Sequence, residues 1–209
     1  MTIELTPQHF LQHPEELAIT EEELVDELNW PYSAEAGPAP AEPPAPQRTR
    51  TISWEDPLAG LPLRRRMTGR EYLEAIQRRE VAPPPMARLM DIEIVEVGDG
   101  RATFEGHPGE QHYNPIGVVH GGFVATLLDS VMGCAIETLQ SADTGYTSLD
   151  LKVNYVRPLT TDTGRVLAEG VVVHAGRRVA TAEGRVFSAR TGKLLAHGTA
   201  TLLILGEQG

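Results

Sequence analysis

Three observations predict an α+β fold in which one antiparallel sheet wraps around a single long helix. First, the periodicity of apolar residues indicates two strands, one long helix and four more strands, in that order. Second, strands this close in sequence pair antiparallel. Third, the helix is apolar on all sides, so other elements must cover it. One helix packed on one antiparallel sheet is an α+β layer arrangement, and an extra N-terminal segment precedes it here.

The first 66 residues are predicted to lie outside the main domain. Residues 1–33 are acidic and are expected to be partly helical, because Thr20 and Glu23 form a capping-box pattern ahead of a narrow apolar stripe. Residues 34–66 begin with a Pro/Ala-rich stretch, which predicts a semi-extended linker followed by an irregular segment.

Residues 67–85 predict a lead-in helix followed by a Pro-rich turn. Thr68 and Glu71 form a second capping box, and apolar residues then recur on one helical face. Three consecutive prolines at 83–85 stop that helix.

Residues 86–206 are predicted to form the main domain. Alternation of apolar and polar residues indicates the strands, and glycines mark the turns between them. We expect strands at 91–97 and 101–106, a helix at 116–139, and strands at about 147–157, 164–175, 177–189 and 193–205. Because the helix lacks a polar face, either the sheet wraps it completely or a second subunit covers the remaining side.

Composition excludes several classes of function. The net charge of -11 argues against a protein that binds nucleic acid through phosphate contacts. Residues 1–30 hold eight carboxylates and no Lys or Arg, so the rest of the chain is close to neutral. The single cysteine, Cys134, allows no internal disulfide, which fits a reducing compartment. With no visible signal peptide and no membrane-length apolar stretch, we expect a cytoplasmic protein without a membrane partner.

Two glycines at the expected start of the buried helix suggest a binding site. Gly121 and Gly122 allow another group to approach the backbone closely, and N–H groups at a helix start favour negative charge. A thioester carbonyl that becomes an oxyanion needs such donors. The alternative is a tight loop in which glycine serves packing.

Asp129 is the second candidate, because it interrupts the apolar helix between Leu128 and Val131. A carboxylate in such surroundings is costly unless it is paired or functional, and desolvation makes a carboxylate a stronger base. The alternatives are a structural hydrogen bond to the backbone, or exposure to solvent where the helix is uncovered.

The spacing of these two candidates predicts a site shared between subunits. Gly121 and Asp129 are eight residues apart, which places them about 12 Å apart along a helix axis. One helix cannot offer both to one carbonyl, whereas two antiparallel helices across a twofold axis can.

Residues 68–206 resemble the PaaI-type hotdog acyl-CoA thioesterases. The resemblance rests on an ordered set of short motifs rather than on any one of them. These are Pro83-Pro84-Pro85, Asn114-Pro115, Gly117-x-x-His120-Gly121-Gly122, Asp129, Ser148-x-Asp150, Tyr155-x-Arg157-Pro158 and Gly176-Arg177.

The resemblance implies a hotdog fold and a role for each site residue. Asp129 would be the general base or a nucleophile, and the Gly121 N–H would polarise the thioester carbonyl. Asn114 and His120 would lie across the site and position the thioester and water. Ser148 would support the water or Asp129, with Thr147 as a possible substitute because the family spacing is one residue shorter. Outside the resemblance, His120 could simply bond the backbone at the helix start.

Binding of the CoA moiety is expected to involve arginines. Arg177 and Arg178 lie at a predicted hairpin and suit phosphate geometry, Arg157 is a further candidate, and Gly122 would line the substrate site. Each arginine could instead be an ordinary solvated residue. The histidines show no metal-ligand spacing and Cys134 lacks an activating neighbour, so we expect no metal, no cofactor and no cysteine nucleophile.

The leading hypothesis is hydrolysis of acyl-CoA thioesters by a homo-oligomer, a dimer with shared sites that pairs again into a homotetramer. A second hypothesis is a hotdog enoyl-CoA hydratase or dehydratase, which needs an acid/base pair over Cα and Cβ. A third is a non-catalytic acyl-CoA binding module, which could dispense with Asp129.

Overall fold

The computed structural model describes residues 46–206, so the predicted acidic segment 1–33 and the start of the linker lie outside the described residues. The helices are α3 (Leu61–Arg64), α4 (Gly69–Gln77), α5 (Pro85–Met90) and α6 (Gly121–Glu137), with short turns η2 (Glu110–His112) and η3 (Thr161–Thr163). The strands are β1 (Ile92–Gly98), β2 (Arg101–Gly106), β3 (Gly145–Tyr155), β4 (Val166–Ala175), β5 (Val179–Ser188) and β6 (Leu194–Leu205).

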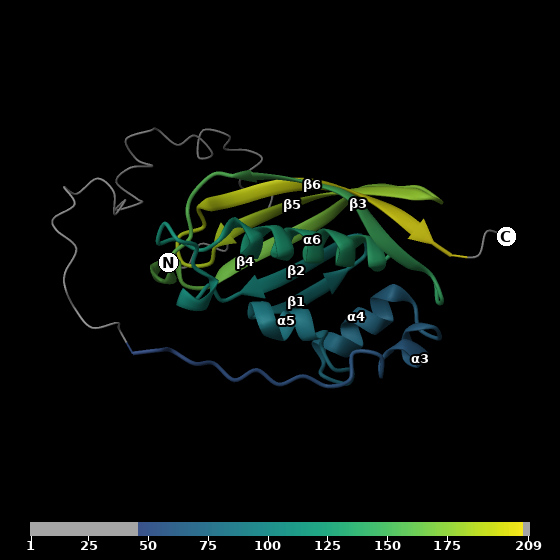
Figure 1. The fold of residues 1–209 in the computed structure, drawn as a ribbon. Coiled ribbons are helices and arrows are strands. Elements are labelled where there is room, and N and C mark those ends of the chain that lie inside the picture. The colour runs from purple at the N-terminus through teal and green to yellow at the C-terminus, as the bar shows by residue number, and fades with distance from the viewer. Residues whose placement is uncertain (1–45, 207–209) are drawn as a thin grey trace, which may run out of the picture.

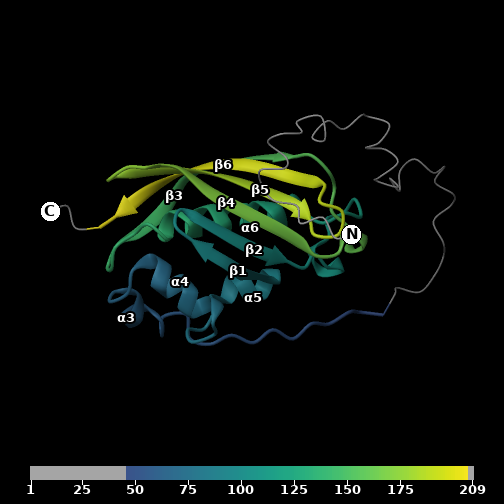
Figure 2. The same ribbon diagram turned by 180° about the vertical axis from the view of Figure 1, so that it is seen from behind.

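The six strands form one sheet in the order β1-β2-β4-β5-β6-β3, and every neighbouring pair is antiparallel. The sheet curves around α6, which lies against its inner face (Figure 1). In the view from behind, the strands lie in front of α6 (Figure 2). This arrangement confirms the predicted α+β fold, and each predicted strand is present with ends shifted by a few residues at most.

The core lies between α6 and the sheet. Leu127, Leu128, Val131 and Met132 are fully buried there, and alternate residues of the strands pack against them. Burying such side chains contributes about 1.5–3 kcal/mol each, so this interface supplies much of the stability of the fold.

The sheet leaves one side of α6 uncovered within this chain, so the alternative of complete wrapping by the sheet was wrong, and cover by a second subunit stays a prediction. A stripe of small and polar residues remains partly exposed along the helix, and it includes Asp129. Its members are Gly122, Ala125, Thr126, Asp129 and Ser130. The helix also begins at Gly121 rather than 116, because residues 114–120 form a hydrogen-bonded loop.

The lead-in region contains two helices that the sequence analysis did not predict, α3 and α5. The predicted capping box of α4 is present: Thr68 Oγ1 accepts from the Glu71 backbone N–H, and the Thr68 backbone N–H donates to Glu71 Oε2 at 2.8 Å. However, α4 ends before the prolines, at Gln77, and Arg79 just beyond it has φ 62°. The prolines instead start α5, because Pro85 occupies its first turn, where no N–H is needed.

A buried ion pair and a close backbone contact connect the lead-in helices α3 and α4 to α6. The Arg64 guanidinium pairs with Glu137 and also donates to the Thr144 carbonyl, and both charged side chains are largely buried. Gly69 packs so closely on the end of α6 that a Cβ would lie 1.9 Å from the Glu137 carbonyl oxygen. The short helices therefore pack as part of the same unit as the sheet.

Residues 46–56 have no regular secondary structure and are tied to the domain by two ion pairs. Arg48 pairs with Glu110 at 3.0 Å, and Arg50 pairs with Asp91 beyond the end of α5. No helix among residues 46–206 is long and apolar enough to cross a membrane.

Candidate active site

The loop before α6 is shaped by Asn114. Its side-chain Oδ1 accepts from the backbone N–H groups of Ile116 and Val118, at 3.1 and 3.3 Å. Gly117 adopts φ 84°, a conformation that glycine takes without strain. Because Oδ1 is engaged by the loop, the Asn114 amide NH₂ is the part of the side chain that can donate to a bound molecule.

His120 caps the helix. Its Nδ1 accepts from the Gly122 N–H at 2.8 Å, which matches the reading of His120 as a residue bonded to the backbone at the helix start. The same bond uses the Gly122 N–H, so within this chain that group does not face a substrate. Because Nδ1 accepts this hydrogen bond, the proton of the neutral His120 ring lies on Nε2. The ring is exposed, so Nε2 is available as a donor.

Gly121 holds the first free N–H of α6. No residue among 46–206 accepts from it, because the first residues of a helix lack an acceptor one turn earlier. Tyr155 covers this residue: its hydroxyl donates to the Gly121 carbonyl at 3.1 Å, and a Cβ on Gly121 would lie 3.0 Å from the Tyr155 ring. Glycine therefore suits this close approach, because a larger residue would crowd the Tyr155 ring. Tyr155 belongs to a motif noted in the sequence, yet no role was predicted for it.

Asp129 lies two turns further along the exposed stripe. The Ser148 hydroxyl donates to Asp129 Oδ1 at 2.7 Å, so β3 and α6 meet at this carboxylate. The register of β3 against β6 shifts between Ser148 and Asp150, and the intervening Leu149 is 58% exposed. Such a bulge redirects side chains locally, and here it accompanies the Ser148 contact.

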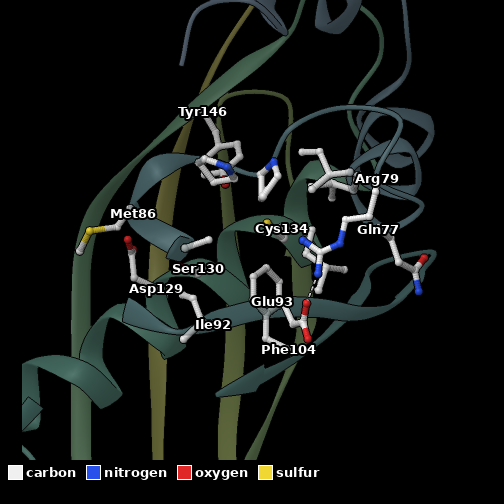
Figure 3. Close-up of a pocket in the computed structure, with 16 residues that line it drawn as sticks. Gln77, Arg79, Met86, Ile92, Glu93, Phe104, Asp129, Ser130, Cys134 and Tyr146 are labelled. Carbon is white, nitrogen blue, oxygen red and sulfur yellow. Dashed lines mark hydrogen bonds and ion pairs between the residues drawn. The ribbon is translucent and has the colours of Figure 1, made fainter. Parts of the chain in front are cut away.

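An apolar pocket of about 230 Å³ ends at Asp129. It lies between α4 and α5 on one side and β1 and α6 on the other (Figure 3). Apolar side chains from all four elements line it, among them Leu73, Ile76, Met86, Ala87, Ile92 and Cys134. The site therefore joins a carboxylate to a space for an apolar group. Sequence reasoning missed this pocket because α5 was not predicted.

Within one chain, the start of α6 and Asp129 in its middle stay apart. Asn114, His120 and Gly121 gather at the helix start, whereas Asp129 and Ser148 lie about 12 Å along the axis. The structure thus brings Asp129 and Ser148 together, and it brings the residues at the helix start together. It does not bring these two groups close to each other within one chain.

The predicted CoA-binding arginines fall into two kinds of environment. Arg177 and Arg178 are exposed in the turn between β4 and β5, and no ion pair holds either of them among the described residues. Arg157 is only 8% exposed, and its guanidinium donates to the Leu194 carbonyl at 2.7 Å. Arg157 therefore lies in the interior, in contrast to the surface position that phosphate binding requires.

The remaining reactive side chains take part in packing or ion pairs. Burial raises the pKa of the Cys134 thiol to about 12, so this residue is a poor nucleophile. Glu93, Glu105 and His107 are close enough to hold a metal ion together. Both carboxylates, however, already pair with arginines, Glu93 with Arg79 and Glu105 with Arg165.

The curved antiparallel sheet around one central helix defines a hotdog-fold protein. Residues 116–195 match the model of the thioesterase superfamily. Human acyl-coenzyme A thioesterase 13 is 30% identical over 118 residues, which cover 54% of this chain and 79% of the relative. The chain belongs to this superfamily, in its PaaI-like branch, and is a thioester hydrolase.

Two solved structures have the same fold. A conserved protein from Pseudomonas aeruginosa is 32% identical, with a TM-score of 0.54, covering 57% of this chain and 93% of that one. A mutant of the phenylacetic acid degradation protein PaaI from Thermus thermophilus is also 32% identical, with a TM-score of 0.51, covering 57% and 97%.

Proposed function

We propose that the protein hydrolyses acyl-CoA thioesters to a free acid and CoA, with Asp129 activating the attacking water. The observation that carries this proposal is a carboxylate, held by the Ser148 hydroxyl, at the end of an apolar pocket. The hydrogen bond from Ser148 orients Oδ1 and leaves Oδ2 to accept from a water molecule. The pocket beside it receives the acyl group.

The reaction balances with one water and no cofactor. Asp129 takes a proton from water, and the resulting hydroxide attacks the thioester carbonyl carbon. The Gly121 N–H stabilises the oxyanion at the start of α6. As the oxyanion collapses, the C–S bond breaks, and the CoA thiolate takes the proton from Asp129. The products are the free acid and CoA.

A second copy of the chain is needed to complete this site. The Gly121 N–H that meets the carbonyl beside Asp129 is that of Gly121 of the partner subunit, because Gly121 and Asp129 of one chain lie too far apart. Strand β3 offers the means of pairing. It is an outer strand of the sheet, eleven residues long, with an unpaired edge within the described chain.

Pairing of two β3 edges across a twofold axis would align the two groups. Ser148 contacts Asp129, and Tyr155 contacts Gly121, so both halves of the site face β3. A twofold axis near Leu151, about midway between Ser148 and Tyr155, would place Asp129 of one helix near the Gly121 end of the other. This register supports a site shared between two chains.

The turn between β4 and β5 supports phosphate binding. Ser148 pairs with Leu202, and Leu202 pairs with Ala180 on the next strand. The turn that carries Arg177 and Arg178 therefore lies at the same end of the sheet as Ser148. Two exposed guanidinium groups at this place suit the phosphates of CoA.

The assay that tests this function is release of free thiol from acetyl-, hexanoyl-, palmitoyl-, benzoyl- and phenylacetyl-CoA. We expect turnover by the wild-type protein and by Asp143→Asn, which makes the same change at an exposed residue that does not line the pocket. Asp129→Asn should lose turnover. Wild-type protein that releases no thiol from any of these substrates contradicts the proposal.

Two further measurements separate the alternatives. Loss of absorbance of an enoyl-CoA without thiol release would indicate a hydratase. Thermal stabilisation by acyl-CoA without either reaction would indicate a binding module.

A further inference from the structure

The wall of the pocket opposite α6 comes from a part of the chain that precedes the superfamily match. Leu73 and Ile76 belong to α4, and Met86 and Ala87 belong to α5, whereas the match begins at residue 116. The reacting end and the apolar wall of the pocket are therefore supplied by different segments. Differences in the lead-in helices can change the pocket without changing the chemistry.

The two ends of the pocket differ in the charged residues that line them. Asp129 and Met86 lie at one side, and Gln77 and Arg79 lie at the opposite side (Figure 3). At that far side, Arg79 forms an ion pair with Glu93 of β1, and both residues line the pocket. An apolar chain that enters beside Asp129 meets a pair of charges after crossing the apolar section.

Arg79 occupies a backbone position that favours glycine. Its φ is 62°, at the point where α4 ends, and the backbone N–H groups of Arg79 and Glu80 bond back to Ile76 and Ala75. A side chain in this left-handed conformation carries a steric cost that glycine avoids. Arg79 nevertheless carries a long side chain here, and the one ion pair of that side chain, with Glu93, lies at the pocket.

We propose that the Arg79–Glu93 ion pair closes the far end of the acyl pocket and limits the length of the acyl chain. This proposal rests on the proposed function, because it assigns the pocket to the acyl group. Because a cavity of roughly 150 Å³ is enough to hold a benzene ring, a pocket of about 230 Å³ has room for one ring or for a chain somewhat longer than six carbons. The substrates are thioesters of short to medium apolar acyl groups, up to about eight carbons, or of a single aromatic ring. A longer chain would have to displace this ion pair, whose two side chains are about half exposed at the mouth of that end.

Chain-length profiles test the proposal. For the wild-type protein, kcat/KM should rise from acetyl- to octanoyl-CoA, by up to about fourfold per buried methylene, and fall for dodecanoyl- and palmitoyl-CoA. Arg79→Gly removes the charge and the side chain at a position suited to glycine, so it should keep the fold. It should raise kcat/KM for dodecanoyl-CoA at least tenfold relative to that for hexanoyl-CoA in the same variant, through KM.

Matched variants separate this role from a general effect of charge. Arg79→Gln should shift the profile in the same direction as Arg79→Gly. Arg78→Gln makes the same substitution one residue earlier, where the arginine pairs with Glu80 outside the pocket, and should leave the profile unchanged. An equal shift in both glutamine variants, or no shift in Arg79→Gly, overturns the proposal.

Binding distinguishes failure of this inference from failure of the proposed function. On an Asp129→Asn background, the Kd of acyl-CoA is measured against chain length with and without Arg79→Gly. A preference for octanoyl over dodecanoyl that disappears with Arg79→Gly supports the proposal even if the wild-type protein releases no thiol. Kd values that do not vary with chain length refute it even if thiol is released.

Discussion

The Ser148 hydroxyl donates a 2.7 Å hydrogen bond to Asp129, which joins an outer strand to the exposed stripe of the central helix. If Asp129 is the base, Asp129→Asn should lower kcat by about 10²- to 10⁴-fold, because the amide cannot accept the proton of water. Ser148→Ala should lower kcat by about tenfold, since it removes a hydrogen bond to a charged group. Thiol release measures both, and thermal unfolding checks that each variant is folded. A fully active Asp129→Asn protein would remove Asp129 from the mechanism.

The free N–H of Gly121 can be deleted selectively. Proline suits the first position of a helix, and His120 already has the extended conformation (φ -59°, ψ 135°) that precedes proline well. Gly121→Pro should therefore keep α6 and lower kcat by about 10²- to 10³-fold. Gly121→Ala retains the N–H and adds a Cβ close to Tyr155, so it is the control for bulk. Equal losses in both variants would assign the effect to crowding rather than to the N–H.

A site shared between two chains predicts complementation. Asp129→Asn and Gly121→Pro chains are each expected to be inactive alone. Random mixing by co-expression should restore about one quarter of wild-type activity, because half of the dimers carry both kinds of chain and one intact site. Mixtures no more active than the separate variants would show that the catalytic groups are not shared in this way.

The Arg64–Glu137 pair predicts a large effect on stability. Both side chains are buried, so Arg64→Met leaves a buried carboxylate without its cation and should cost about 3–5 kcal/mol. The double variant Arg64→Met/Glu137→Gln should regain most of this loss, because no buried charge remains. Urea unfolding of the two variants measures the difference. A double variant as unstable as the single one would mean that packing, and not charge, causes the loss.

The same pair predicts a dependence on pH. Burial raises the pKa of Glu137, while hydrogen bonding and the charge of Arg64 act against this shift. In Arg64→Met the folded state holds the Glu137 proton more tightly than the unfolded state does. Its free energy of unfolding should therefore rise as the pH falls towards the ordinary pKa of a glutamate, and fall as the pH increases. The variant with Glu137→Gln should lack this dependence.

Cys134 should be dispensable for catalysis. Its pKa of about 12 means that almost no thiolate exists at neutral pH. We expect Cys134→Ala to retain turnover, apart from small changes in acyl preference because the residue lines the pocket. Loss of thiol release in a folded Cys134→Ala protein would contradict a mechanism based on Asp129.

The sequence predicted the sheet and its central helix because apolar periodicity reports which side of each element is buried. It did not predict α5, because consecutive prolines stop one helix and also start the next. The apolar composition of α6 hid its exposed stripe, since glycine and alanine fit either environment. The link between Asp129 and Ser148 came from family resemblance, whereas the Arg64–Glu137 pair spans 73 residues and leaves no local pattern.

The outer edge of β3, which is unpaired within the described chain, would make turnover depend on the concentration of the protein. If two edges must meet before Asp129 faces the Gly121 N–H of the partner subunit, turnover per chain should fall on dilution while the fold of each chain persists. At low enzyme concentration the rate should then rise as the square of the concentration, and become proportional to it once pairing is complete.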